Sequence, residues 1–221
     1  MEIKVLQNIL SANDAIARKN QSLLNKHGVL TINIMASPGA GKTSLILQTI
    51  NMLKETARIA VIEGDIASTI DADKVTKQGV TAIQINTGGS CHLDANMTEN
   101  ALNNLSLDDI DLLLIENVGN LVCPAGFALG EHKRVMLSSL PEGDDKPYKY
   151  PTMFSEADVV LINKVDLSPL LEFDISSFAK AVSGLNPKVK IFQVSCKTGQ
   201  GLEDWSSWLQ DTIKEMKSRQ G

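Results

Sequence analysis

The sequence lacks a surplus of basic residues, an even number of cysteines and a long apolar run at its start. Its 221 residues carry a formal net charge of -5. Phosphate backbones are bound by clustered Lys and Arg, so we expect no nucleic-acid partner. The first residues mix acidic and polar side chains with apolar ones, which predicts neither a signal peptide nor a transmembrane helix. We therefore expect a cytoplasmic protein without a membrane partner.

The three cysteines cannot all pair within one chain. In a reducing compartment they are candidates for packing, redox chemistry or metal ligation. With 43% hydrophobic residues, the chain can bury the core of a globular domain. Residues 1–28 place apolar side chains at helical spacing and end at Gly28, which predicts an N-terminal helical segment before a main domain over residues 29–221.

Short apolar runs alternate with amphipathic stretches along the main domain, which predicts an α/β fold. We expect a mostly parallel sheet of about seven strands with helices on both faces, and ligands at the carboxyl ends of the strands. The stretch Pro141–Pro151 is expected to be a loop, because Pro and Gly flank its charged residues. The predicted strands are Leu30–Met35, Arg58–Ile62, Thr81–Ile85, Leu112–Ile115, Arg134–Leu137, Val159–Ile162 and Ile191–Val194.

A phosphate-binding loop is predicted at Ala36–Thr43, between a strand and a helix. The segment matches G-x-x-x-x-G-K-[ST] except that Ala36 replaces the first glycine. Its glycines allow backbone N–H groups to face phosphate oxygens, and Lys42 neutralises them. The motif predicts a P-loop NTPase fold with a nucleoside triphosphate as ligand. The expected nucleotide contacts here are Gly39, Ala40, Gly41, Lys42, Thr43 and Ser44.

A base-reading motif follows the strand Val159–Ile162. In the segment Asn163-Lys164-Val165-Asp166, Asp166 can accept hydrogen bonds from guanine N1–H and from the exocyclic amine. Adenine offers neither donor, which favours GTP and GDP. Asn163 is expected to face N7 and the Lys164 stem to lie along the base. Ser195 and Lys197 bound a second base loop, which is expected to offer a backbone N–H to guanine O6.

Acidic residues at two other strand ends predict a Mg²⁺ site beside the phosphates. Thr43 supplies a hydroxyl, while Glu116 and Asp65 are the expected carboxylates near the metal or the attacking water. Gly119 is expected to present its amide to the γ-phosphate. Asn120 stands where a catalytic Gln would follow, so we expect slow hydrolysis. The predicted catalytic residues are Lys42, Asp65, Glu116 and Gly119.

A candidate transition-metal site combines Cys91 and His92 on one loop with Cys123 beyond Gly119. Thiolate and imidazole suit Zn²⁺ or Ni²⁺. Three ligands leave the coordination incomplete, so a second subunit or solvent would finish it, and a metal-bridged homodimer follows. The alternative is that the thiols are small buried apolar groups. Cys196 is assigned to packing.

Together these residues resemble the hydrogenase nickel-incorporation GTPase family, HypB, from about Val29 to the C-terminus. The segments Asn86–Asp94 and Glu116–Pro124 look like its signatures. The resemblance implies a GTPase in the maturation of nickel-iron hydrogenase, with Cys91, His92 and Cys123 as metal ligands and a dimer promoted by GTP. It also implies a HypA-type nickel chaperone and a hydrogenase large-subunit precursor as partners. The candidate chaperone contacts are Val5, Leu6, Ile9 and Leu10.

Some members of that family begin with a cysteine-rich or His-rich nickel motif, and this sequence has neither. Nickel storage by the N-terminus is therefore not expected. Three alternatives stay open. A urease accessory GTPase has a similar fold but carries Cys-Pro-His where this chain has Ser-Cys-His. A regulatory GTPase could use the thiols only for packing, and a metabolic P-loop kinase could share the phosphate loop.

Overall fold

A computed structural model gives the structure of residues 2–65 and 70–218. Side chains are described from residue 10 onward, except at positions 70 and 71. The candidate contacts Val5, Leu6 and Ile9 therefore lie outside the described side chains, and Leu10 is half-buried.

A parallel seven-stranded sheet forms the centre of the protein, in the order β3-β2-β4-β1-β5-β6-β7. Every neighbouring pair runs in the same direction. This confirms the predicted α/β fold, and each predicted run lies in a strand to within a few residues. The strands are β1 Leu30–Ala36, β2 Ile59–Asp65, β3 Thr81–Asn86, β4 Leu112–Glu116, β5 Lys133–Ser139, β6 Val159–Asn163 and β7 Lys190–Gln193.

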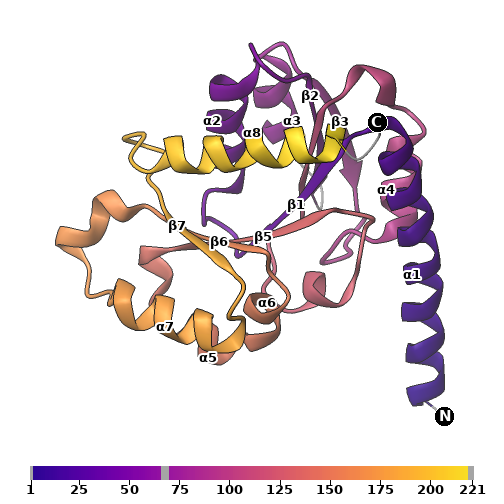
Figure 1. The fold of residues 1–221 in the computed structure, drawn as a ribbon. Coiled ribbons are helices and arrows are strands. Elements are labelled where there is room, and N and C mark those ends of the chain that lie inside the picture. The colour runs from indigo at the N-terminus through magenta and orange to yellow at the C-terminus, as the bar shows by residue number, and fades with distance from the viewer. Residues whose placement is uncertain (1, 66–69, 219–221) are drawn as a thin grey trace.

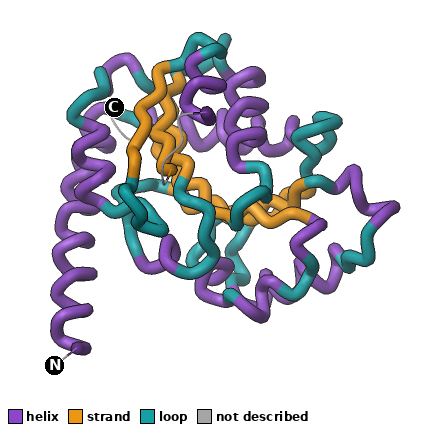
Figure 2. Tube along the Cα trace, turned by 180° about the vertical axis from the view of Figure 1, so that it is seen from behind, coloured by secondary structure: helices purple, strands orange, loops and turns teal. Residues whose placement is uncertain are grey.

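Helices cover both faces of the sheet (Figures 1 and 2). One face packs on α2, α3 and α8. The other packs on α6 and α7 at one end and on α1 and α4 at the other. The helices are α1 Glu2–His27, α2 Lys42–Leu53, α3 Ile70–Thr76, α4 Ala95–Leu102, α5 Lys146–Lys149, α6 Pro151–Ser155, α7 Ile175–Leu185 and α8 Leu202–Ser218, with short 3-10 turns η1 Leu107–Asp109, η2 Cys123–Gly126, η3 Leu140–Glu142 and η4 Val165–Leu170.

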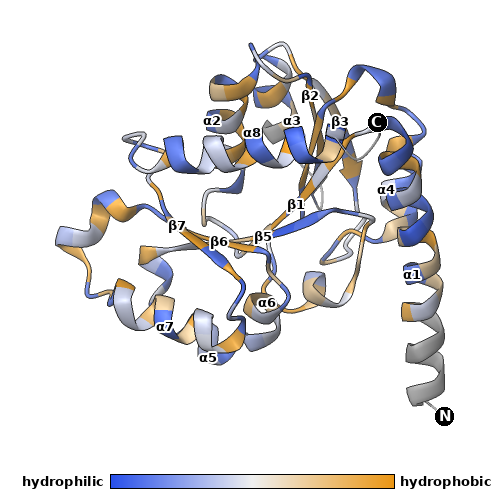
Figure 3. Ribbon diagram, viewed as in Figure 1, coloured by the Kyte–Doolittle hydropathy of each residue, from blue (hydrophilic) through white to orange (hydrophobic). Residues whose placement is uncertain are grey.

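The strands are apolar because both of their faces are covered, and Figure 3 shows them among the most hydrophobic segments. Successive side chains of a strand point to opposite faces. In β1, Ile32 and Ile34 therefore face α2 and α8, while Met35 packs toward α6 and α7. A charged or amide side chain inside such a strand needs a local partner. Asn33 and Glu63 are both buried in strands, and Asn33 accepts from Asn117 and donates to Glu131.

Helix α1 ends at a glycine and its first turns extend past the sheet (Figures 1 and 2). Gly28 has a φ of 67°, which a left-handed helix end requires. The N–H groups of Gly28 and Val29 donate to the carbonyls of Asn25 and Leu24. Among residues 2–65 and 70–218, none of the helices combines the length and the hydrophobicity that a bilayer span needs.

The prediction of a loop over Pro141–Pro151 is wrong in part. This segment contains the end of η3 and the whole of α5, and Pro151 begins α6. Pro147 and Pro151 stand in the first turns of their helices, where a missing N–H costs nothing. Glu142 closes a capping box with Ser139. Proline here starts short helices instead of interrupting structure.

Helix α8 carries both tryptophans of the chain. Trp205 is fully buried, and its indole N–H donates to Thr49 Oγ1 of α2 at 2.9 Å. Trp208 stacks on Trp205 with the ring centroids 5.2 Å apart. These contacts join the last helix to the helix that follows β1.

Asp111 fastens three distant segments at the amino ends of the strands. Its buried carboxylate accepts hydrogen bonds from the backbone N–H and the guanidinium of Arg58, and it pairs with Lys217 of α8 at 3.0 Å. The Arg58 guanidinium holds the pKa of the Asp111 carboxyl well below its usual range. The ion pair stabilises the charged form of Asp111 in the folded protein.

We expect Asp111→Asn to lower the free energy of unfolding by about 2 kcal/mol at pH 7, because charge-assisted hydrogen bonds are lost. The native pKa is depressed, so the contribution of Asp111 is full above the unfolded pKa and disappears as the pH falls through the native one. The difference between the proteins should stay constant above about pH 5 and shrink below it. Urea denaturation at several pH values measures this.

Asp109→Asn is the matched control for this measurement. Asp109 is exposed and lies 3.9 Å from Arg58, so its loss should change the free energy of unfolding by less than about 0.5 kcal/mol. Equal effects of the two substitutions would contradict the role of Asp111.

Candidate functional site

The loop between β1 and α2 has the backbone geometry that phosphate binding requires. Gly39 and Gly41 adopt φ values of 78° and 104°. A Cβ on Gly41 would lie 2.6 Å from the side-chain nitrogen of Asn163, so a larger residue is excluded there. Helix α2 begins at Lys42, so the positive end of its dipole points into this loop. The loop can therefore hold an anion such as a phosphate chain.

Residues of the predicted base motif brace the same loop from the side. Asn163 Nδ2 donates to the Ala40 carbonyl at 2.9 Å, and Lys164 Nζ donates to the Gly39 carbonyl at 2.7 Å. Lys164 has a φ of 62°, a left-handed conformation that is costly for a lysine. The phosphate loop and the β6 motif thus form one connected structure.

A cavity of about 330 Å³ opens between these two segments, and Ser195 stands behind it. The Ser195 hydroxyl donates to Asp166 Oδ1 at 2.6 Å, and its backbone N–H donates to the Gln200 carbonyl. Ser195 can therefore orient Asp166 but does not line the cavity itself. The lining residues are Gly41, Ser44, Asn163, Lys164, Asp166, Leu167, Cys196 and Lys197.

Carboxylates and a hydroxyl meet beside the start of α2. Thr43 Oγ1 donates to Glu116 Oε1 at 3.1 Å, and Lys42 Nζ lies 3.9 Å from the same oxygen. Glu63 of β2 is the register partner of Glu116 in β4. Asp65 ends β2 and is half-buried. Hydroxyl and carboxylate oxygens are the ligands that Mg²⁺ takes in proteins, so this donor set fits that ion.

Two contacts place the chain after β4 against the phosphate loop. A Cβ on Gly119 would lie 3.0 Å from Pro38. The Asn120 N–H donates to the Ala36 carbonyl at 2.9 Å. The Ser37 hydroxyl, on the same loop, donates to the Glu142 carboxylate, which also accepts from the N–H and hydroxyl of Ser139.

Three side chains that could hold a metal ion converge nearby. Cys91 Sγ lies 3.2 Å from Cys123 Sγ and 3.6 Å from His92 Nδ1. One ligand atom from each residue lies within 4.8 Å of the other two. The ring of Phe127 packs on His92 with centroids 4.1 Å apart. The structure thus brings together the three residues that the sequence analysis proposed as ligands.

The surroundings of these ligands affect their protonation. The hydrogen bond with Cys91, and then burial, raise the pKa of the Cys123 thiol. Burial lowers the pKa of His92, so its imidazole is neutral near pH 7 and can donate a nitrogen lone pair. Burial raises the pKa of Cys196 to about 11, and its side chain packs against the core.

The Asn120 side chain connects the two ligand-bearing loops. Its Nδ2 donates to the Cys91 carbonyl at 3.2 Å, while its Oδ1 accepts from the N–H groups of Val122 and Cys123 at 2.8 and 3.4 Å. Because the Asn120 backbone is bonded to Ala36, a single residue contacts the phosphate loop and both loops of the Cys91–His92–Cys123 cluster.

Comparison with known proteins identifies the family. Residues 30–193 match the model of the CobW/HypB/UreG nucleotide-binding domain. The chain belongs to the CobW/HypB/UreG family. It is 46% identical over 208 residues to the hydrogenase maturation factor HypB of Rhizobium leguminosarum, covering 94% of this chain and 70% of that protein. The resemblance noted from the sequence is confirmed.

Solved structures of HypB share the fold. The crystal structure of HypB from Archaeoglobus fulgidus is 40% identical with a TM-score of 0.86, and the match covers 92% of this chain and 99% of that one. HypB from Helicobacter pylori, solved in complex with nickel, is 41% identical with a TM-score of 0.87 and coverage of 92% and 96%. As a CobW/HypB/UreG protein, the chain contains a P-loop nucleotide-binding domain.

Several residues of this CobW/HypB/UreG site were not found by sequence reasoning. Glu63 interrupts an apolar strand, which was an available signal. No local sequence signal marked Glu142 or Phe127. Their contacts with Ser37 and His92 join residues that are far apart in the sequence. Asn120 was considered only as a replacement for a catalytic Gln, and its hydrogen bonds were not predicted.

We expect diamide, a mild thiol oxidant, to join Cys91 to Cys123 before it modifies Cys196. The two thiols lose two protons and two electrons, an S–S bond forms, and the N=N bond of diamide is reduced to a hydrazine. Reaction at Cys196 should be at least about tenfold slower. Cys91 is exposed and lies 3.2 Å from Cys123 Sγ, whereas Cys196 is half-buried and its raised pKa leaves little thiolate. Differential alkylation with peptide mass spectrometry measures both rates, with Cys91→Ser as control. Faster modification of Cys196 would contradict this geometry.

Proposed function

We propose that this chain is a GTP-hydrolysing metallochaperone switch that assists nickel insertion during maturation of nickel-iron hydrogenase. The observation that carries the proposal is the position of Asn120. Its backbone is bonded to the phosphate loop, and its side chain is bonded to the loops of Cys91 and Cys123. A change of nucleotide that moves the phosphate loop would therefore move Asn120 and alter its hydrogen bonds to the loops of Cys91 and Cys123.

The nucleotide is a guanine nucleotide in this proposal. Asp166 lines the base cavity, and the Ser195 hydroxyl fixes one of its oxygens at 2.6 Å. The second carboxylate oxygen can accept from guanine, which presents two donors on one edge. An adenine in the same cavity would leave the carboxylate unmatched.

The hydrolytic residues are Lys42, Asp65, Glu116 and Gly119, with Mg²⁺ held through Thr43, Glu116 and Asp65. Bound Mg²⁺ would supply charge neutralisation at the terminal phosphate. Lys42 is buried, and its ammonium lies 3.9 Å from Glu116 Oε1, so it stands beside the carboxylate proposed to hold Mg²⁺. Gly119 lies against Pro38, where its amide can reach a terminal phosphate.

The transferred metal is Ni²⁺, and Zn²⁺ competes for the same donor atoms. Cys91, His92 and Cys123 supply three ligands, and a second copy of the chain completes the coordination. Cys91 is exposed and Val122 is 66% exposed, so this surface is available to a second subunit. We propose a GTP-dependent homodimer in the cytoplasm.

The proposed partners follow from the family. Relatives are named hydrogenase maturation factors, which supports a hydrogenase large-subunit precursor as client. A HypA-type nickel chaperone is proposed to bind the N-terminal segment, residues 1–28, which precedes the nucleotide-binding domain at 29–221. The projection of α1 past the sheet supports this (Figure 1).

Asp166→Asn tests the choice of base. We expect GDP affinity to fall at least about a hundredfold, since two charge-assisted hydrogen bonds of ~1.5 kcal/mol each are lost. Xanthosine diphosphate should bind better than it does to the unmodified protein, because its C2 carbonyl accepts from the new amide. Calorimetric titration with guanine, adenine and xanthine diphosphates measures this.

Asp174→Asn is the control for that titration. Asp174 is exposed and caps α7 through the Ser177 N–H, a role that Asn also fills. Its GDP affinity should equal that of the unmodified protein. Unchanged GDP affinity in Asp166→Asn would contradict guanine reading and favour a kinase.

Cys123→Ala tests the metal function. We expect at least about tenfold weaker binding of Ni²⁺ with a non-hydrolysable GTP analogue present, because one of three ligands is gone. The dimer fraction at fixed Ni²⁺ should fall with it. Chelator competition and mass photometry measure the two effects under reducing conditions.

Cys196→Ala removes a thiol that lies outside the cluster, and it should bind Ni²⁺ like the unmodified chain. If Cys123→Ala also kept full affinity, the thiols would be structural and the regulatory alternative would stand.

A further inference from the structure

Three side-chain amides on one face of α1 contact the main body. Asn20 and Gln21 follow Asn13 by seven and eight positions, so the three side chains lie along one helix face. Asn13 and Asn20 are 7% and 2% exposed. Each donates to or accepts from backbone groups more than seventy residues away, so none of these bonds stabilises α1 itself.

The backbone groups directly follow the two loops that carry the proposed metal ligands, at the first residue of α4 and in residues 128–129. Asn20 Nδ2 donates one hydrogen to the Ala95 carbonyl and the other to the Leu129 carbonyl, both at 2.9 Å. Asn13 accepts from the Ala95 N–H and donates to the Ala128 carbonyl, again at 2.9 Å. Ala95 follows the Cys91–His92 loop, and residues 128–129 follow Cys123 and Phe127.

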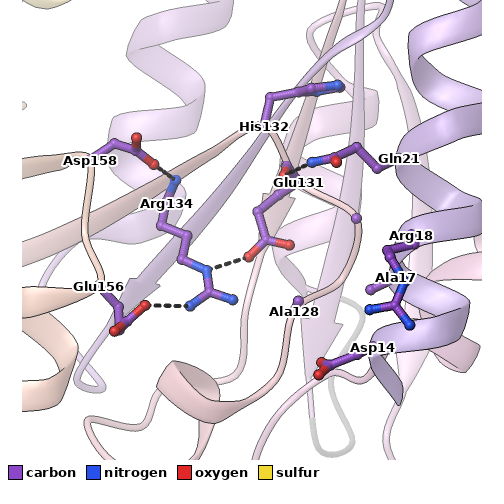
Figure 4. A pocket seen from close by; sticks show the side chains of 11 residues that line it. Asp14, Ala17, Arg18, Gln21, Ala128, Glu131, His132, Arg134, Glu156 and Asp158 are labelled. Carbon is purple, nitrogen blue, oxygen red and sulfur yellow. Dashed lines mark hydrogen bonds and ion pairs between the residues drawn. The ribbon is translucent and has the colours of Figure 1, made fainter. Parts of the chain in front are cut away.

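The second loop fits tightly against α1. Gly130 has a φ of 103°, and a Cβ on it would lie 2.5 Å from Asn20 Cβ. Gln21 Nε2 donates to the Glu131 carbonyl at 2.9 Å, a contact drawn in Figure 4. The Glu131 carboxylate accepts from the Leu129 N–H at 2.6 Å and from Arg134 at 2.7 Å.

Apolar packing and a polar pocket both lie beside the second loop. Leu129 is fully buried in the cluster that contains Leu24 of α1. A pocket of about 360 Å³ separates α1 from the start of β5 there. Figure 4 shows charged and amide side chains around it, among them Asp14, Arg18 and Glu131. Burial of Leu129 holds this segment against α1, and the directional hydrogen bonds fix its register along the helix, because hydrophobic burial is not directional.

The loop of Cys91 and His92 is also hydrogen-bonded to the end of β4. Asn117, at the end of β4, accepts from the Leu93 N–H at 3.0 Å. Its Nδ2 donates to Asn33 Oδ1, and Asn33 in turn lies 3.4 Å from the Glu131 carboxylate. The two loops thus share one buried polar network, which α1 closes from outside.

We propose that α1 positions the metal ligands, with Asn13 and Asn20 as the positioning residues that hold the Cys91–His92 loop and the Cys123 loop at the separation that coordination needs. This inference rests on the proposed metal function. Neither asparagine reaches a ligand atom. Both act through the backbone that follows the ligands, as supporting hydrogen bonds do at metal centres.

Asn20→Leu tests the proposal, since leucine has a similar volume and cannot donate. We expect Ni²⁺ affinity to fall about tenfold, and the diamide-driven Cys91–Cys123 disulfide to form more slowly, with GDP affinity unchanged. Asn13→Ala removes the amide without adding bulk and should shift both readouts in the same direction. It tests the proposal if Asn20→Leu does not fold.

Asn186→Leu is the matched control. Asn186 Nδ2 also donates to two backbone carbonyls, those of Ser155 and Ala157, but it holds α7 to the end of α6. It should reduce thermal stability without changing Ni²⁺ affinity or the disulfide rate.

The two measurements separate the possible failures. If Asn20→Leu and Asn13→Ala keep the disulfide rate and Ni²⁺ affinity of the unmodified protein, or if Asn186→Leu loses them equally, the positioning role is overturned. If the unmodified protein forms the disulfide but binds no Ni²⁺, the proposed metal function fails, while slower disulfide formation in the α1 variants still supports positioning of the loops.

Discussion

The parallel direction of the seven strands is the constraint on which the site depends. Parallel strands end at a common edge, so residues that follow different strands meet without any long loop. Ala36 ends β1, Asp65 ends β2, Glu116 ends β4 and Asn163 ends β6. These positions are scattered over more than half of the chain, yet they all lie at the sheet edge that carries the phosphate loop. Reversal of a single strand would carry its residue to the opposite edge.

Side-chain amides connect the parts of that edge. Asn163 joins the β6 motif to the phosphate loop, Asn120 joins the phosphate loop to the loops of Cys91 and Cys123, and Asn20 joins α1 to the segments that follow those loops. An amide can donate and accept at once and carries no charge. It can therefore be buried between backbone groups at a smaller cost than a carboxylate or an ammonium. The result is a set of loops whose positions depend on one another.

Local sequence patterns were sufficient for the strands and the phosphate loop. Each of these is encoded within about ten neighbouring residues, as an apolar run or as a glycine that the backbone requires. Contacts between distant segments were not predictable. Ser37 and Glu142 are 105 positions apart, and Asn20 and Leu129 are 109 apart. An exposed and a buried asparagine look alike in a sequence, and the prolines of the segment 141–151 signalled a loop where they begin helices.

The packing of α8 on α2 has a spectroscopic consequence. All tryptophan emission of the chain originates from this one helix, from an indole bonded to Thr49 and a second ring stacked on it. Helix α2 starts at the phosphate loop and continues directly beneath Trp205. Intrinsic fluorescence is therefore a local signal from the junction between the nucleotide site and the C-terminus, and it reports on that junction without any attached dye.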